Sequence, residues 1–449
     1  MANFNLKKGH NLKIAGAPNK VLSHTILADH VYFHPMDFPG IKPKLLVKQE
    51  DVVLVGSPIF IDKLNPEVKF VSPVSGVISE IQFGERRVIQ RIVIKSDGQF
   101  NNLNVDSVVT DKLSPEELKS TLAESGLWPA IRQRPFSKIA NPAQTPRDIF
   151  ISVFSTAPFS IDCAFGLEGR ESDFQLGLDA LSKLTSGALH LSMSADESAS
   201  IFTQAKNVKI NKFTGQHPAG NIGVQIHHIA PISSKEDVVW YLSAQSVADM
   251  GEYLRTGNLP TEKIITIAGS SITEPTYVKI TKGTSLKDIL SDRLNSIDKV
   301  RVISGDVLSG ESRELAQGIR YHDETVCAIP ESTEREFLGW ALPGLSKYSL
   351  SRTFLSALLP KKSTTLNTSM NGSHRAIISF GRWENVLPMD ILPEFLVKSI
   401  LARDIEEMEK LGIYECAEED FALCSFVCQS KTDVSGIIGS GLQLAELEG

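Results

Sequence analysis

The spacing of hydrophobic positions changes along the chain. Up to about residue 100, short apolar runs alternate with Gly and Pro, which is typical of a small β-rich domain. The runs that predict strands are 44–47, 51–55, 59–61, 70–71, 76–81 and 88–94. Val and Ile alternate along both halves of this stretch, so that two curved sheets can share one core, with tight turns at Gly56 and Gly76. Residues 1–100 are therefore predicted to form an all-β domain.

Two half-motifs in this domain resemble each other, VKQEDVVLVGSPIF at 47–60 and SPVSGVI at 72–78. Together they resemble the paired halves of biotinyl- and lipoyl-type barrel-sandwich domains. A carrier of that class presents a modifiable lysine on a hairpin tip, and Lys63 lies near that place. The sequence around Lys63 lacks the Met-Lys-Met signal of a carrier, so we interpret Lys63 as a solvated turn lysine.

The middle of the chain predicts a connecting segment followed by an α/β layer. Residues 101–147 are rich in Asn, Ser and Pro, with one helix predicted after a Ser114 cap and before Gly126. From 148 to 258, strands and helices alternate, which favours an open, Rossmann-like sheet. The predicted strands are 149–155, 188–193 and 238–243, and the predicted helices are 173–184, 197–205 and 245–255.

The last two regions differ from each other in type. Residues 259–330 predict a compact α+β domain, with strands at 263–268, 277–280 and 299–304 and with Thr284 as the cap of a helix through Leu290. Residues 331–449 predict a mainly helical region, because apolar positions recur at helical spacing over 392–411. The fold class is therefore multidomain, α/β and α+β.

Charge and hydropathy narrow the classes of function. The chain has 46 Lys and Arg against 53 Asp and Glu, which gives a net charge of -7 and no basic footprint for nucleic acid. No window reaches the roughly twenty apolar residues of a membrane-spanning helix, and the start, MANFNLKK, has no secretion signal. We therefore expect a cytoplasmic protein whose five cysteines are reduced thiols.

Several motifs, taken jointly, resemble one family, the NqrA subunits of the sodium-translocating NADH:quinone reductase (Nqr) complexes. They are IAGAP at 14–18, HPAGNIG at 217–223, RVISGDVLSG at 301–310, GRWE at 381–384, LPMDI at 387–391 and ECAEEDFALCSFVC at 415–428. The resemblance covers nearly the whole chain and implies a β-grasp-like domain of the SLBB type at 259–330. One departure is Gln429, where the family often has Pro.

The resemblance implies a role in a translocase that couples NADH oxidation and ubiquinone reduction to Na+ export. Members of the family are expected to be peripheral on the cytoplasmic face of the bacterial inner membrane, with membrane subunits of the complex as partners. NADH, flavins and Fe-S clusters belong to partner subunits, and this chain is expected to hold no cofactor, metal or catalytic residue of its own, with ubiquinone as a ligand. The alternative is a flavin- or Fe-S-bearing NADH dehydrogenase or Rnf-type electron-transfer subunit.

Two motifs bear on that alternative. Cys416, Cys424 and Cys428 provide three of the four thiolates that a cluster needs, so a fourth ligand would have to come from a distant part of the chain. We favour packing of these thiols as small hydrophobic side chains. The Gly-rich loop 215–223 is followed by VQIHHI, which we interpret as a strand, so the loop predicts a close backbone turn in preference to a phosphate site.

The same region carries the candidates for a quinone contact, His217, Gly220, His227 and His228. Imidazole titrates near neutral pH and can deliver a proton to a quinol oxygen. Adjacent histidines on a strand would face opposite sides, and no carboxylate partner can be identified from the sequence. For each histidine, a contact with quinone is therefore one hypothesis. The other is that the side chain has a structural role, hydrogen-bonded in the core or exposed at the surface.

Overall fold

The computed structural model describes residues 2–103, 113–296, 299–332, 338–339, 341–345, 347–351, 353–359 and 363–449. Two small sheets form the barrel-sandwich domain that the sequence predicts. One has the order β3 (His30–Phe33), β9 (Ile89–Ser96), β8 (Gly76–Phe83) and β5 (Val52–Val53), and the other has the order β4 (Pro43–Leu45), β6 (Pro58–Asp62) and β7 (Lys69–Val71).

The core of this domain lies between the two sheets. Phe60 and Phe70 stack with ring centroids 4.2 Å apart, and both are fully or almost fully buried. A Cβ on Gly76 would lie 2.0 Å from the Lys95 carbonyl oxygen, so only glycine allows β8 to begin this close to β9. Lys63 is exposed in the turn after β6.

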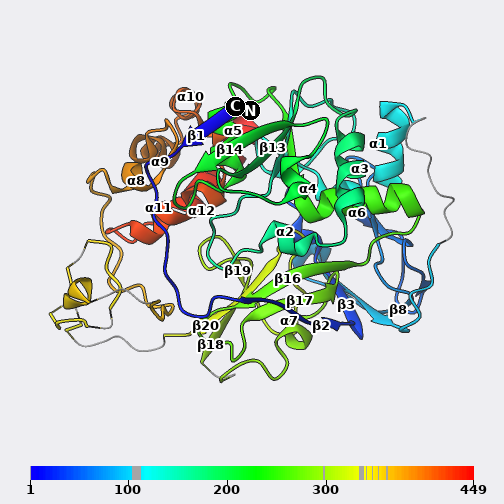
Figure 1. Cartoon of the computed structure of the whole chain (residues 1–449), viewed down its shortest axis with the longest axis horizontal. Helices are drawn as coiled ribbons and strands as arrows, with labels where there is room; N and C mark the ends of the chain where they lie inside the picture. Colours follow the sequence, from blue (N-terminus) through cyan, green and yellow to red (C-terminus); the bar gives the residue numbers. More distant parts are fainter. Residues whose placement is uncertain are drawn as a thin grey trace.

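The Rossmann-like domain is built on a seven-stranded sheet, visible in the upper half of Figure 1. Its order is β1 (Ala2–Asn5), β14 (Lys209–Thr214), β13 (Leu189–Ser194), β12 (Ile149–Ser152), β15 (Val239–Ser243), β10 (Arg132–Arg134) and β11 (Lys138–Ile139). The first five strands are parallel. The strand order reverses between β12 and β15, which is where ligands bind in open α/β sheets.

The central strands β12 and β15 are apolar on both faces because both faces of the sheet are covered there. Ile149, Ile151 and Trp240 point to the core shared with α3 (Glu171–Leu181) and α6 (Ala244–Thr256). Phe150 and Tyr241 alternate with them and point to the core shared with α5 (Ile222–Ile229) and the C-terminal helices. The C-terminal region is therefore a second helical layer on this sheet.

The segment before the first predicted strand of the α/β layer also contributes to the large sheet. The expected connecting segment, 101–147, contains α1 (Pro115–Glu124) and also contributes β10 and β11 to the large sheet. Both strands are too short and polar to be predicted from pattern, and pairing with β15 specifies them. The predicted cap of α1 is confirmed, since the Glu117 N–H donates to Ser114 Oγ at 3.2 Å.

The N-terminal residues join two different sheets. β1 pairs in parallel with β14, and β2 (Asn19–Ile26) forms one edge of a six-stranded sheet. That sheet has the order β19 (Glu311–Ser312), β18 (Val300–Ser304), β20 (Thr325–Pro330), β16 (Glu262–Ala268), β17 (Thr276–Thr281) and β2. Its helix α7 (Leu286–Leu290) is capped by Ser285 and not by Thr284, whose hydroxyl donates to the Thr281 carbonyl at 2.6 Å.

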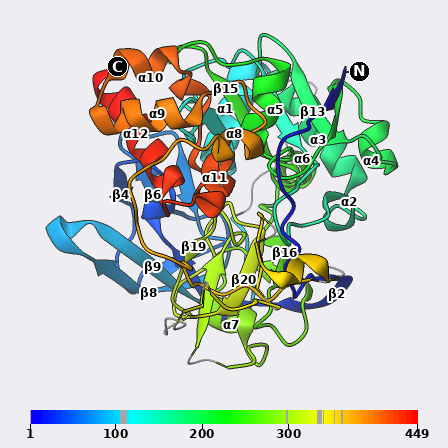
Figure 2. The ribbon, with the colours of Figure 1, turned by 90° about the vertical axis from the view of Figure 1, so that its left-hand side faces the viewer.

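The C-terminal helices are α8 (Arg382–Val386), α9 (Pro393–Ala402), α10 (Ile405–Lys410), α11 (Ala422–Val427) and α12 (Val434–Glu448), seen on the near side in Figure 2. The stretch 392–411, whose apolar positions recur at helical spacing, forms two helices, α9 and α10. Arg403 has a φ of 57°, which ends α9, and Asp404 then caps α10 by accepting from the Glu407 N–H at 3.1 Å.

The remaining short elements are α2 (Cys163–Gly166), α4 (Ser200–Thr203), η1 (Pro35–Asp37), η2 (Glu85–Arg87), η4 (Trp128–Ala130), η5 (Leu355–Leu358), η6 (Ile413–Glu415) and η7 (Glu418–Phe421). Within the described ranges, no helix combines the length and the apolar content needed to cross a bilayer.

Candidate functional site

The Gly-rich loop after β14 leads into a helix, which corrects the strand predicted for 224–229. Ile222–Ile229 is α5, with Asn221 at its N-cap position. Val224 and Ile226 are β-branched residues that favour a strand, but burial against the sheet overrides that preference. A helix N-terminus, which we expected to be absent, therefore does follow the loop.

The start of α5 is covered by the chain's own C-terminal segment. A Cβ on Gly223 would lie 2.1 Å from Asp420 Oδ2, so the carboxylate sits directly against the first turn of the helix. A carboxylate is a suitable group for this position, because helix N-termini favour negative charge. Asn221 Nδ2 also donates to the Glu419 carbonyl at 3.0 Å. The place where a phosphate would approach α5 is thus occupied by η7.

A fully buried arginine holds η7 in this position. Arg134 on β10 donates to Asp420 Oδ2 at 2.9 Å and to Glu419 Oε1 at 2.8 Å. Burial is the largest influence on Asp420 and raises the pKa of its carboxyl to about 6, with Arg134 opposing the shift. The ion pair joins β10 of the large sheet to the C-terminal region.

His217 and Gly220 lie in the loop itself. His217 is buried, its Nδ1 is 3.2 Å from Thr156 Oγ1, and its Nε2 has no partner among the described residues. Burial lowers the pKa of His217 to about 4, so the imidazole is neutral at pH 7. Gly220 donates its N–H to Thr156 Oγ1 at 2.9 Å, and a Cβ there would lie 2.5 Å from the Thr156 nitrogen.

His227 and His228 lie in the last turn of α5 and form hydrogen bonds with the loop before α9 and, in the case of His227, also with η6. His227 Nε2 accepts from the Asp390 N–H at 2.9 Å, so the proton on Nδ1 is donated to Glu415 Oε2 at 2.7 Å. His228 Nε2 donates to the Pro388 carbonyl at 2.7 Å, and burial lowers its pKa. Both rings therefore have structural partners, and neither shares a contact with His217.

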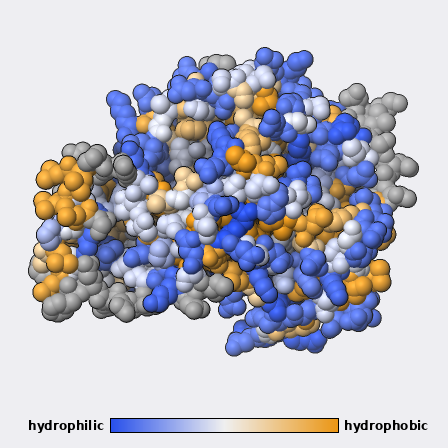
Figure 3. All heavy atoms as spheres, turned by 60° about the horizontal axis from the view of Figure 1, so that its bottom comes forward, coloured by the Kyte–Doolittle hydropathy of each residue, from blue (hydrophilic) through white to orange (hydrophobic). Residues whose placement is uncertain are grey.

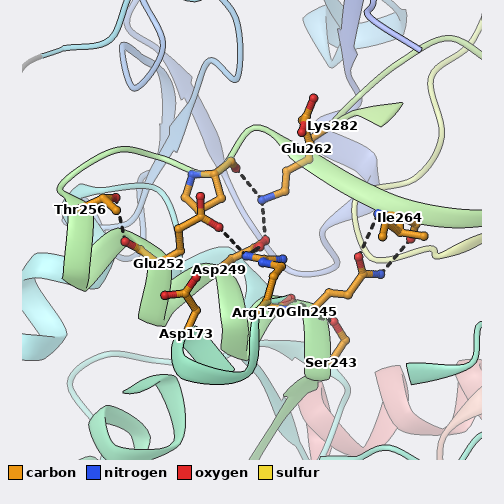
Figure 4. Close-up of polar contacts among 12 residues, drawn as sticks. Arg170, Asp173, Ser243, Gln245, Asp249, Glu252, Thr256, Glu262, Ile264 and Lys282 are labelled. Atoms are coloured by element: carbon orange, nitrogen blue, oxygen red, sulfur yellow. Dashed lines mark hydrogen bonds and ion pairs between the residues drawn. The ribbon is translucent and has the colours of Figure 1, made fainter. Parts of the chain in front are cut away.

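A second candidate lies between the α/β domain and the domain at 259–330, at the carboxyl end of β15. Figure 4 shows the polar groups around the start of α6, including Ser243, Gln245 and Asp249. They line a small hollow with a cavity volume of about 50 Å³, which is partly open to solvent. Its other walls come from Leu127, Ala130, Arg132, Ser246, Lys263, Lys282, Tyr321, His322 and Glu324.

Some charges of this hollow are paired within the protein. Asp249 accepts from Lys282 Nζ at 2.6 Å and from Arg170 at 2.7 Å, as drawn in Figure 4. Lys263 Nζ donates to the carbonyls of Tyr321 and Asp323, at 3.2 and 2.7 Å. Burial lowers the pKa of Lys263 to about 8, which places its titration close to neutral pH.

Two donors of the hollow remain available to a ligand. The Arg132 guanidinium lies 4.6 Å from the Tyr241 ring centroid and makes no hydrogen bond to any described residue. His322 packs edge-on against Tyr321, with ring centroids 5.0 Å apart, and burial lowers its pKa well below the usual value. Leu127 and Ala130 add apolar surface to the lining, so the hollow can receive a small ligand that has both acceptor oxygens and an apolar face.

Comparison with known proteins agrees with this domain order. Three family models match, described as the NqrA N-terminal barrel-sandwich hybrid domain at 4–97, the NqrA second alpha/beta domain at 113–259 and the NQRA C-terminal domain at 264–314. The corresponding subunit, NqrA, of the Na(+)-translocating NADH-quinone reductase of Yersinia pestis bv. Antiqua (strain Angola) is 37% identical over 450 residues, which covers 99% of both chains. The chain belongs to the NqrA family.

Further members show the same extent of similarity. The NqrA proteins of Rhodopirellula baltica and Haemophilus influenzae are 36% and 38% identical, and each match covers 99% of this chain and 98% or 99% of the relative. Among solved structures, an NAD+-reducing [NiFe]-hydrogenase in the H2-reduced state matches with 10% identity and a TM-score of 0.39, over 76% of this chain and 62% of that one. That likeness is too weak to carry an argument.

In this member of the NqrA family, the three C-terminal cysteines pack as small hydrophobic side chains. Cys416, Cys424 and Cys428 are buried in the C-terminal core. Burial raises the pKa of the Cys416 and Cys424 thiols, which keeps them protonated. Across the described residues, no three His, Cys, Asp or Glu side chains are grouped so as to hold a metal ion.

Sequence reasoning found the loop but missed the hollow. Arg132 lies in a strand that the pattern did not predict, and Lys263 and Glu324 come from a different domain. One signal in the sequence pointed to the hollow. Ser243 ends an apolar strand and caps the helix that follows it, and ligands bind at such strand ends in α/β domains.

Proposed function

We propose that this chain is a non-electron-carrying component of a sodium-translocating NADH:quinone reductase, peripheral on the cytoplasmic face of the bacterial inner membrane. Its partners are the membrane subunits of the complex, and NADH, flavins and Fe-S clusters belong to those partner subunits. The single observation that carries this proposal is the match to NqrA proteins over 99% of the chain. The occupied start of α5 supports it, because η7 fills the position that a nucleotide phosphate would take.

We further propose that the chain contributes to ubiquinone binding through the hollow between the domains. A quinone head group has two carbonyl acceptors and a flat apolar ring. Arg132 and His322 can donate to the carbonyls, and Leu127 and Ala130 offer apolar contact. Lys263 can release a proton near neutral pH, and an oxygen of the reduced quinone takes up a proton as the quinol forms.

The four residues first predicted for this contact, His217, Gly220, His227 and His228, stay a prediction. His227 and His228 are engaged by Glu415 and Pro388, which favours a structural role for both. His217 keeps one buried nitrogen without a partner among the described residues and is the strongest of the four. The hollow is favoured over His217 because it offers space as well as donors.

The test uses the assembled complex. Arg132→Gln is expected to raise the KM for ubiquinone while NADH oxidation by the artificial acceptor ferricyanide stays unchanged, because only the acceptor end is altered. Arg86→Gln, at an exposed arginine of the β8–β9 hairpin, is the matched control. An unchanged quinone KM in Arg132→Gln, together with a raised KM in His217→Ala, would move the contact to the loop. His227→Ala is expected to leave the quinone KM unchanged.

A further inference from the structure

The two carboxylates that line the hollow, Asp249 and Glu324, have different environments. Asp249 accepts from Arg170 and from Lys282, so two cations balance its charge directly. Glu324, just before β20, accepts instead from neutral side chains and forms no ion pair with a described residue. Since protonation of Asp249 would leave two cations without their partner, Glu324 is the carboxylate that can carry a proton at lower cost.

The donors to Glu324 come from the start of α6. Gln245 Nε2 donates to the Ile264 carbonyl and Gln245 Oε1 accepts from the Ile264 N–H, both at 2.9 Å, as drawn in Figure 4. The second amide proton of Gln245 is donated to Glu324. Ser243 Oγ accepts from the Ser246 N–H at 3.3 Å and donates its own proton to Glu324. A carboxylate has about four acceptor sites, so two donors leave the carboxyl able to bind a proton as well.

The groups that face Glu324 set the pH at which its carboxyl titrates. Burial raises the pKa of Glu324, and the charge of Asp249 adds to the rise, whereas the two hydrogen bonds and the charge of Lys263 act against it. Cys163 of α2 also faces the carboxyl, and its thiol stays protonated because burial raises its pKa. The other titratable or charged side chains of the lining are Arg132, Lys282, Tyr321 and His322.

Lys263 is held directly beside Glu324. Its Nζ donates to the carbonyls of Arg320, Tyr321 and Asp323, at 3.4, 3.2 and 2.7 Å. An ammonium group has three N–H donors, so this one turn of the chain engages all of them. The same turn leads into Glu324, which follows Asp323. Two side chains that can release a proton therefore lie together in the lining of the hollow.

We propose that Glu324 donates the second of the two protons that ubiquinone takes up when the quinol forms. This role rests on the proposed function, which assigns ubiquinone to the hollow. Reduction of a quinone consumes two electrons, which partner subunits supply, and two protons, one for each oxygen. Lys263 can release one proton, and the O–H bond of the Glu324 carboxyl breaks as the O–H bond on the other oxygen forms. The remaining carboxylate takes a proton from solvent through the open side of the hollow.

A glutamate at the surface of the same domain provides the control. Hydrophilic side chains cover much of the face that the domain at 259–330 presents to solvent, as Figure 3 shows. Glu274, in the turn before β17, is exposed and does not line the hollow. Glu274→Gln therefore removes one carboxylate from this domain and leaves the lining intact.

The experiment measures kcat and KM for ubiquinone over a range of pH in the assembled complex. In the wild type we expect kcat to fall in two steps as the pH rises, the upper step near pH 8 from Lys263 and the lower step from Glu324. Glu324→Gln still accepts hydrogen bonds but has no proton to donate. It should lower kcat about tenfold or more and remove the lower step, with the ubiquinone KM and NADH oxidation by ferricyanide unchanged.

Two further variants separate proton donation from a structural role. Glu324→Asp keeps the carboxyl and should retain the lower step with a kcat between those of the wild type and Glu324→Gln. Glu274→Gln should match the wild type in both steps. A wild-type kcat and pH profile in Glu324→Gln overturn the proposal. Loss of the lower step in Glu324→Asp overturns it too, and that variant decides the matter if Glu324→Gln does not assemble.

Failure of this role can be told from failure of the proposed quinone contact. If Arg132→Gln raises the quinone KM but Glu324→Gln keeps the wild-type profile, only the proton donor is wrong. If Glu324→Gln loses the lower step while Arg132→Gln leaves the KM unchanged, the contact with Arg132 is wrong and the proton donor stands.

Discussion

Two strand-to-helix connections at the same edge of the large sheet differ in what covers them. After β14, the loop and the start of α5 are covered by η7, with Arg134 and Asp420 fully buried. After β15, the start of α6 faces a hollow that is partly open to solvent. Its lining includes the Arg132 guanidinium, which has no hydrogen-bond partner among the described residues. The same topology thus gives a closed, structural connection in one place and an accessible polar cavity in the other.

A loop motif therefore does not identify a ligand site by itself. The glycines after β14 are required by close packing, since Gly220 abuts Thr156 and Gly223 abuts Asp420. The connection after β15 has no glycine motif, but Ser243 caps α6, and the α/β domain and the domain at 259–330 leave space in front of it. Accessibility is decided by what the rest of the chain places there.

The largest loss of stability is expected when the ion pairs of Arg134, which hold η7 against the start of α5, are removed. Arg134→Met leaves Asp420 and Glu419 without their cation and should lower the free energy of unfolding by about 3–5 kcal/mol, the cost typical of breaking a buried ion pair. Urea unfolding followed by circular dichroism measures it. Arg403→Met, which breaks the exposed pair with Glu448, should cost no more than ~1 kcal/mol and is the control.

Gly223→Ala tests the contact between α5 and η7. The new Cβ would overlap Asp420 Oδ2, and we expect a loss of about 1–3 kcal/mol in unfolding free energy. In an Asp420→Ala background the same substitution should cost clearly less, because the obstructing carboxylate is gone. Equal costs in the two backgrounds would show that the carboxylate does not limit the space at Gly223.

Acidification should lower the free energy of unfolding, because His217 is buried in the folded protein and resists protonation there. Burial lowers the pKa of His217 to about 4, whereas the unfolded value is near 6.5. The unfolded state therefore binds the proton first, and stability is lost as the pH falls from about 6.5 toward 4, with a slope of up to ~1.4 kcal/mol per pH unit. His217→Gln should reduce that slope in urea titrations at several pH values. An unaltered slope would assign the acid sensitivity to other groups, such as His34, whose pKa is also lowered to about 4 by burial.

The smallest effect on stability is expected from a substitution of Arg132, which lines the hollow in front of α6. Arg132 stacks near the Tyr241 ring and has no hydrogen-bond partner among the described residues, so Arg132→Gln should change the unfolding free energy by ~0.5 kcal/mol or less. Thermal melts of the wild type and this variant check the prediction. A loss as large as that of Arg134→Met would mean that Arg132 is structural and would weaken its assignment to a ligand.

Much of the fold follows from local pattern. The β-rich start, the strand and helix alternation after residue 148 and the cap of α1 were all predicted, because periodicity and capping are local properties. The strands β10 and β11 were not, since RQR and KI carry no strand pattern and depend on pairing with β15. α5 was taken for a strand because Val224 and Ile226 are β-branched, and only its packing between sheet and C-terminal region makes it helical.

The site was predictable only in part. The sequence located the loop of His217 and Gly220, but the partners of His227 lie 163 and 188 residues further along the chain, at Asp390 and Glu415. The hollow combines Arg132, Lys263 and Glu324 from different domains, and no local signal joins residues at such separations. Long-range contacts therefore decided which candidates are engaged and which are free.

The most direct test of the proposed role is an absorption spectrum with flavin and iron analysis of the purified chain, followed by a ubiquinone titration of the same sample. We predict a protein without flavin or iron that binds ubiquinone saturably, with weaker binding in Arg132→Gln and unchanged binding in Arg86→Gln. Stoichiometric flavin or iron would contradict that role, because the chain would then carry electrons itself.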